Sequence, residues 1–204
     1  VHQIKTPLSV MRLQLQSEDT PENRAMLVEL FQMEQYVTMA LSYARLGNPT
    51  KDLVLTRVPL DPVIRQAIRD FAPLLIRKKL RLQYEPTAES ALTDSKWLLF
   101  ILHQLLSNAV KYTDRGRVSI RVTSAPAIIV ADTGIGIAPE DVPRVFEKGY
   151  TGYNGRGGQK STGLGLYLVH QTAEMLHCRV SLSSRIGEGT SVTIDLHQEE
   201  LGKE

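Results

Sequence analysis

The chain has 204 residues, of which 42% are hydrophobic, and its net charge is +2. This composition is ordinary for a globular protein, and the length allows one medium-sized domain with a smaller one. The near-neutral charge gives no electrostatic reason to expect nucleic acid or a membrane surface as a partner, and the single cysteine, Cys178, excludes a disulfide framework or cysteine-based metal site within the chain.

Two helices are predicted at the start of the chain. Apolar side chains recur at helical spacing over residues 4–15, and after an interruption Thr20 can cap a second helix with Pro21 in its first turn. Its apolar stripe comprises Leu27, Leu30, Met33, Val37, Leu41 and Ala44. Two helices bury little area, so we expect a hairpin that dimerises as a four-helix bundle. No signal peptide or membrane span is visible in the sequence. It begins at Val1 inside a predicted helix, without an initiator methionine, so we expect an upstream part to be missing.

The rest of the chain alternates strands and helices. The predicted strands are 53–55, 80–84, 91–93, 118–123, 128–131, 180–183 and 190–196, and the predicted helices are 60–79, 96–112, 140–146 and 162–176. Asp61 is expected to cap the first of these helices and Asp94 or Ser95 the second, and residues 149–160 form a long polar loop of the functional kind. This order predicts an α+β fold, in which a hairpin (1–47) precedes a two-layer α/β sandwich with a mixed sheet (48–198) and a tail (199–204).

Three segments, in this order, predict a nucleotide site. Asn108, on a helix face, can hold Mg²⁺ by its amide oxygen. Asp132, followed by Gly134 and Gly136, can read an adenine amino group where backbone must come close. Residues 161–166 (STGLGL) supply a Ser-Thr cap and a helix N-terminus whose free N–H groups suit phosphate. Alone, the first segment is also compatible with an exposed polar helix face and the second with a strand-ending turn; their order and spacing together are specific.

Other ligand motifs fail. Residues 155–161 superficially resemble a P-loop, but Gln159 stands where that motif needs a glycine before the lysine. Residues 134–139 likewise do not make a dinucleotide fingerprint. Three further histidines show no metal-ligand grouping: His170, His177 and His197.

Together the three segments resemble the ATP-binding domain of sensor histidine kinases, within the wider family that includes gyrase and Hsp90 ATPases. The matching boxes are 103–112 (N box), 132–136 (G1 box), 143–146 (F box), 149–160 (ATP lid) and 187–190 (last glycine box). The resemblance implies ATP and Mg²⁺ as cofactors, with Asn108 on the metal, Lys111 on phosphate and Tyr112 near the adenine. The other implied nucleotide-contacting residues are Asp132, Gly134, Gly136, Lys148, Lys160, Ser161, Thr162, Gly163, Leu164, Gly165 and Thr190. Phe146 is expected to pack under the lid, and the glycines of 187–189 are equally compatible with a plain hairpin turn.

Residues 2–8 (HQIKTPL) resemble the H box of the same family. The resemblance implies that His2 attacks the γ-phosphate of ATP and passes the phosphoryl group to an aspartate of a response regulator. Thr6 corresponds to the residue that positions water for the reverse dephosphorylation. With residues 146–152 (FEKGYTG), this H box is most similar to the bacitracin-sensing, intramembrane-sensing kinases of Firmicutes. That likeness implies a homodimer on the cytoplasmic side of the cell membrane, an intact protein embedded in the membrane, an ABC transporter as candidate partner, and no nucleic acid.

Two residues depart from the family pattern. Relatives that hydrolyse ATP carry a glutamate four residues before the Mg²⁺ asparagine, and this chain has Gln104 there, whose amide cannot take a proton. A gyrase- or Hsp90-type ATPase would therefore lack its general base. Gln3 replaces the acidic residue that usually follows the histidine, so a nucleotide-binding scaffold with weak kinase activity is the alternative to an active histidine kinase.

Overall fold

The computed structural model describes residues 2–46, 53–152 and 162–197. The chain divides into two compact units, residues 1–48 and 49–204. In the described part, no helix combines the length and the apolar character needed to cross a membrane.

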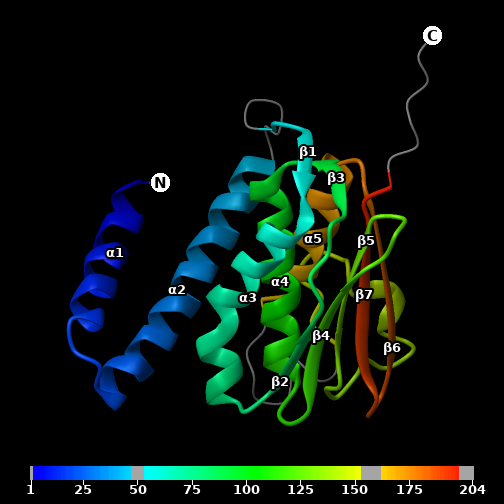
Figure 1. The fold of residues 1–204 in the computed structure, drawn as a ribbon. Coiled ribbons are helices and arrows are strands. Elements are labelled where there is room, and N and C mark those ends of the chain that lie inside the picture. Colours follow the sequence, from blue (N-terminus) through cyan, green and yellow to red (C-terminus); the bar gives the residue numbers. More distant parts are fainter. Residues whose placement is uncertain (1, 47–52, 153–161, 198–204) are drawn as a thin grey trace. The chain divides into compact units, whose positions relative to one another are not determined.

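The first unit consists of two helices, α1 (His2–Gln16) and α2 (Pro21–Leu46), which run in opposite directions and pack together (Figure 1). Thr20 caps α2 as expected, because its hydroxyl accepts a hydrogen bond from the Asn23 N–H at 3.1 Å. The buried apolar side chains of these two helices are Leu8, Val28, Leu30 and Met39. An ion pair between Arg12 and Glu34 also joins the two helices.

The second unit is built on a five-stranded mixed sheet of strand order β2-β4-β5-β7-β6. Its strands are β2 (Arg81–Tyr84), β4 (Arg117–Val122), β5 (Ala127–Asp132), β6 (Arg179–Arg185) and β7 (Gly189–Asp195). Only β2 and β4 are parallel, and the other pairs are antiparallel. A separate antiparallel pair joins β1 (Thr56–Pro59) to β3 (Ser90–Thr93). The predicted α+β class with a mixed sheet is confirmed.

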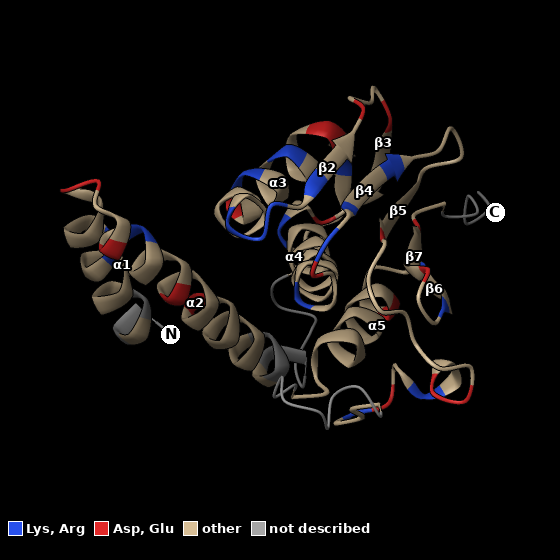
Figure 2. Ribbon diagram, turned by 90° about the horizontal axis from the view of Figure 1, so that it is seen from below, with Lys and Arg blue, Asp and Glu red and all other residues tan. Residues whose placement is uncertain are grey.

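Three helices cover one face of this sheet: α3 (Leu60–Arg77), α4 (Ser95–Tyr112) and α5 (Gly165–Met175) (Figures 1 and 2). The central helix α4 packs against both α3 and α5 and is the most deeply buried. Asp94 caps it, because its carboxylate accepts hydrogen bonds from the N–H groups of Lys96 (2.9 Å) and Trp97 (3.2 Å). Alternate residues of the strands face the helices, which gives the two-layer core.

The first strand and the cap of α3 differ from expectation. The strand predicted at 53–55 lies later, at Thr56–Pro59, because the Val54 N–H donates to the Asp94 carboxylate (2.9 Å) instead of to a strand. Asp61 does not cap α3, whose N-cap is Pro59 without any side-chain hydrogen bond. The Asp61 carboxylate lies one residue into the helix and accepts from Arg65 and Tyr84, each at 2.7 Å. The buried face of α3 carries Leu60, Ile64, Ala67, Phe71 and Leu75.

Two predicted helices are shorter in the structure. Only a 3-10 turn, Val142–Arg144, forms within 140–146, because so short a segment with a proline cannot recover the cost of helix nucleation. The helix predicted from residue 162 begins at Gly165, because Gly163 has φ +65° and cannot join a right-handed helix. Thr162 therefore does not cap α5; its hydroxyl accepts from the Leu164 N–H at 3.3 Å in the preceding turn.

Candidate functional site

Asp132 ends β5 as a partly buried carboxylate. Burial raises the pKa of Asp132, and the N–H groups of Gly134 and Thr190 partly offset that rise. The Gly134 N–H donates to Asp132 Oδ1 at 2.8 Å. This hydrogen bond helps to orient the carboxylate, which can accept a further hydrogen bond from a ligand amino group.

The loop after Asp132 lies between the end of α4 and the β6–β7 turn. The Ile135 N–H donates to the Tyr112 carbonyl (3.1 Å), and the Ile135 carbonyl accepts from the Gly187 N–H (2.9 Å). A Cβ at Gly134 would lie 2.4 Å from the Tyr112 carbonyl oxygen, and one at Gly136 would lie 2.0 Å from that of Arg185. We expected backbone to come close to a ligand at these glycines. In the structure, the groups that come close to them are backbone carbonyls of the same chain.

Replacing Gly136 with alanine should lower the free energy of unfolding by more than about 1 kcal/mol. Gly136 has φ +70°, so the substitution adds backbone strain to a collision with the Arg185 carbonyl. Gly187→Ala is the matched control, because Gly187 has φ +77° but nothing within 4 Å of the added Cβ. Urea denaturation should show a larger loss for Gly136→Ala; equal losses would mean that the collision relaxes freely.

Thr190, on β7, lies directly opposite Asp132 on β5. Its hydroxyl is 2.9 Å from Ser184 Oγ, which also donates to the Gly189 carbonyl (2.9 Å) and accepts from the Ile137 N–H (2.9 Å). Because Ser184 has a single proton to donate, Thr190 is the donor between the two hydroxyls and keeps its own lone pairs for a ligand. The sequence carries no signal for Ser184, which looks like any polar strand residue.

The start of α5 lies beside the polar side of α4. A Cβ built at Gly165 would be 3.3 Å from Gln104 Oε1 and 3.9 Å from Asn108 Oδ1. Gln104 is buried, whereas Asn108 is partly exposed. The α5 N-cap, Leu164, makes no side-chain hydrogen bond to these first N–H groups. A helix N-terminus beside an amide oxygen suits a phosphate group with a bound cation.

Lys111 and Tyr112, the other two residues of the predicted N box that are expected to contact the nucleotide, lie at the end of α4. Burial lowers the pKa of Lys111, whose ammonium lies 5.3 Å from the centre of the Tyr112 ring. The Phe146 ring lies 5.5 Å from the ring of His170 on α5, in agreement with a packing role for Phe146. The Gly149 N–H donates to the Gly163 carbonyl at 2.9 Å, which joins the two ends of the predicted lid.

The structure does not bring several other predicted site residues next to Asp132 and the start of α5. Lys160 and Ser161 lie outside the described residues, and so do the side chains of His2 and Gln3. Thr6 is exposed on α1, in the first unit, and Lys148 is exposed on the segment before Gly149. Within the described ranges, no group of three His, Cys, Asp or Glu side chains could hold a metal ion.

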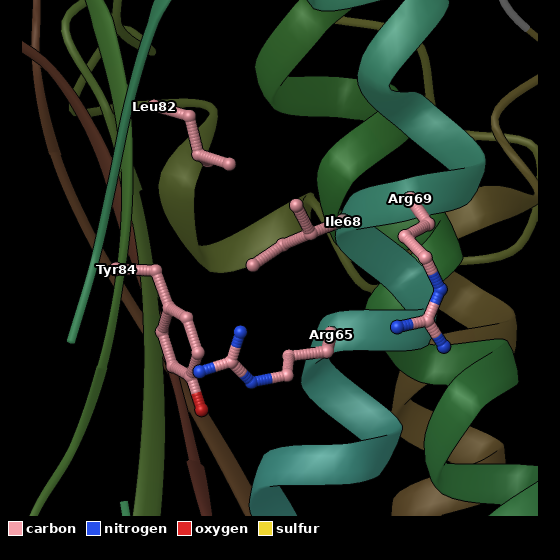
Figure 3. A pocket seen from close by; sticks show the side chains of 5 residues that line it. All are labelled: Arg65, Ile68, Arg69, Leu82 and Tyr84. Carbon is pink, nitrogen blue, oxygen red and sulfur yellow. The ribbon is translucent and has the colours of Figure 1, made fainter. Parts of the chain in front are cut away.

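A cavity of about 390 Å³ lies between α3 and β2, on the side of α4 away from α5 (Figure 3). Its lining residues are Arg65, Ile68, Arg69, Leu82 and Tyr84. Arg65 and the Tyr84 hydroxyl both bind the Asp61 carboxylate, and Arg69 donates to Gln66 at 2.7 Å. Because its polar groups already have partners within the chain, this cavity is not the candidate site.

Comparisons with known proteins agree with the geometry. Residues 93–200, more than half of the chain, match the family model of histidine kinase-, DNA gyrase B- and HSP90-like ATPases. Sensor protein BceS of Halalkalibacterium halodurans is 36% identical over 203 residues, which cover 98% of this chain and 61% of that protein. Sensor histidine kinase YxdK of Bacillus subtilis is 36% identical over 198 residues, covering 94% and 61%. The chain thus spans about three fifths of the length of these curated relatives.

Among solved structures, full-length ShkA in complex with AMPPNP superposes with a TM-score of 0.65 and 25% identity, covering 95% of this chain and 43% of that one. The resemblance to bacterial sensor histidine kinases, and to the Firmicutes group in particular, is confirmed.

Proposed function

The chain belongs to the family of histidine kinase-, DNA gyrase B- and HSP90-like ATPases, and we propose that it is the catalytic core of a sensor histidine kinase. In this proposal, residues 1–47 are the dimerisation and phosphotransfer hairpin and residues 48–198 bind ATP. One observation carries this proposal. The similarity to a sensor protein extends over 98% of the chain, so it includes both the H box (2–8) and the G1 box (132–136).

ATP is proposed to bind between α4, α5 and the end of the sheet where Asp132 of β5 lies opposite Thr190 of β7. Asp132 would accept a hydrogen bond from the adenine amino group, with Thr190 beside it. The N-terminus of α5 would receive the phosphates, together with Lys111, Lys148, Lys160, Ser161 and Thr162. Bound Mg²⁺, held by Asn108 and phosphate oxygens, would neutralise charge on the phosphates. The partly buried carboxylate, the α5 N-terminus without a side-chain cap and the adjoining amide support this arrangement.

The proposed reaction is transfer of the γ-phosphoryl group to His2. A bond forms between an imidazole nitrogen and phosphorus, the bond from phosphorus to the bridging oxygen breaks, and ADP leaves. The phosphoryl group then passes to an aspartate of a response regulator, and Thr6 would orient water for dephosphorylating that aspartate. An ATPase of the gyrase or Hsp90 type is not favoured, because the buried side chain at the general-base position is the amide of Gln104.

Incubation with radiolabelled ATP tests this function. A kinase should acquire acid-labile, base-stable phosphate, as expected for phosphohistidine. A nucleotide-binding scaffold would bind ATP without being labelled, and an ATPase would release phosphate without retaining it. Binding without label under conditions that label a related sensor kinase would therefore replace the kinase proposal with the scaffold.

We further propose that the hairpin forms a homodimer once the chain is extended upstream of Val1. Large apolar side chains are exposed along both helices: Ile4, Val10, Met11, Leu13, Met26, Met33 and Tyr36. Light scattering should give the mass of a dimer, and Leu13→Glu should weaken it because a charge then enters an apolar interface. Gln14→Glu is the control, since it adds the same charge at the neighbouring exposed position. If the extended chain without substitutions is a monomer, the four-helix dimer is ruled out.

The partners of the intact protein follow from the relatives. Because these are named sensor proteins and the chain spans only part of them, we propose that the whole protein lies in the cell membrane with this core on the cytoplasmic side. A cognate response regulator and an ABC transporter are the proposed partners.

A further inference from the structure

Lys78 joins the end of α3 to the end of α4. It is the C-cap residue of α3, and its ammonium reaches back over the last turn of α4. Its Nζ donates to the carbonyls of Val110 (2.8 Å), Thr113 (3.1 Å) and Lys111 (3.2 Å), and it lies 3.3 Å from Asp114 Oδ1. A cation among the last carbonyls of a helix both satisfies acceptors and complements the helix dipole.

The backbone around Lys78 holds it in place. Lys79 has φ +54°, which ends α3, and the Leu80 N–H donates to the Leu75 carbonyl at 3.0 Å. Arg81 then begins β2, with its N–H bound to the Gly116 carbonyl at 3.0 Å. The chain around Lys78 is therefore tied to the segment between α4 and β4 in two ways, through the Lys78 ammonium and through the Arg81 N–H.

Within this run of carbonyls, the one that Lys78 does not bind is that of Tyr112. It accepts instead from the Ile135 N–H in the loop after Asp132, and a Cβ at Gly134 would lie 2.4 Å from it. Lys78 therefore fixes the α4 end from one side while the Asp132 loop rests on it from the other.

We propose that Lys78 is a positioning residue for the nucleotide site: it holds the end of α4 so that Tyr112 fixes the loop that orients Asp132. This inference rests on the proposed function. Lys78 itself need not touch the nucleotide, because its ammonium is occupied by the α4 carbonyls. Its loss should loosen the Asp132 loop and, through it, weaken nucleotide binding.

The test compares Lys78→Met with Lys79→Met in the full chain. Both variants lose one positive charge from neighbouring residues, and the exposed Lys79 side chain is not among the groups that hold α4. Without nucleotide, the Ile135 amide should exchange with solvent at least about tenfold faster in Lys78→Met than in Lys79→Met. The affinity for ADP with Mg²⁺, measured well below each variant's thermal midpoint, should fall at least about fivefold in Lys78→Met only.

A double-mutant cycle separates positioning from general loss of stability. If Lys78 acts through the Asp132 loop, Lys78→Met should cost less than about twofold in affinity when Asp132 is already asparagine. An undiminished effect in that background, or unchanged exchange and affinity in Lys78→Met, would overturn the inference while leaving nucleotide binding by the parent intact. A parent that binds no nucleotide would overturn the proposed function and this inference together.

Discussion

Gln3→Glu should raise the single-turnover rate of histidine phosphorylation, by up to the ~10²–10⁴-fold range of general-base assistance. The attacking imidazole nitrogen of His2 must be neutral and correctly oriented. The Gln3 amide oxygen can hold the ring by accepting a hydrogen bond, but it offers no negative charge as the imidazole gains positive character during attack. A carboxylate at residue 3 supplies both. Rapid-quench labelling with saturating ATP measures the rate.

Two variants make this experiment decisive. His2→Ala should abolish labelling, because no other residue is proposed to accept phosphate. Gln3→Asn keeps an amide but shortens its reach, so it should not reproduce the acceleration. A rate in Gln3→Glu equal to or below that of the parent would show that the amide is no handicap, and another residue would then have to orient His2.

Local chemistry accounts for the elements that the sequence predicted well. Asp94 followed by the apolar run of α4 is a cap and a buried helix, and both follow from hydrogen bonds within one turn and from side-chain periodicity. The strand that ends at Asp132 is apolar throughout and is followed by glycines, so its end was predictable. The mixed sheet likewise follows from the order of strands and helices.

What the sequence did not predict depends on contacts between distant residues or on single dihedral angles. Lys78 reads as one more surface cation after a helix, and its partners lie about thirty residues later. The role of Ser184 is likewise set by the approach of Ile137 across the sheet end. Helix α5 starts at Gly165 instead of the predicted residue 162, because Gly163 takes a left-handed conformation. The first strand starts later than predicted, because the Val54 N–H donates a hydrogen bond to the Asp94 carboxylate, forty residues away in the sequence.

Asp132→Asn should weaken nucleotide binding at least tenfold. Losing a hydrogen bond to a charged group typically costs about 1.5–3 kcal/mol, and the asparagine side chain can also turn a donor toward the adenine amino group, which is itself a donor. The fold should tolerate the change: burial raises the pKa of Asp132, so folding favours its neutral form, and any stability from this group is present at low pH and lost as pH rises through the folded pKa. Isothermal titration with ATP and Mg²⁺ measures the affinity.

Asp195→Asn is the matched control, because Asp195 ends β7 at the opposite end of the sheet from Thr190 and pairs with Arg179 at 3.1 Å. Its affinity for ATP should equal that of the parent. The pH dependence gives an independent check. Since the pKa of Asp132 is raised, the parent should lose affinity on acidification at a higher pH than the usual aspartate value of about 3.9. Asp132→Asn should lack this loss, because its amide does not titrate in that range. Unchanged affinity in Asp132→Asn would mean that the adenine is read by another group of the site.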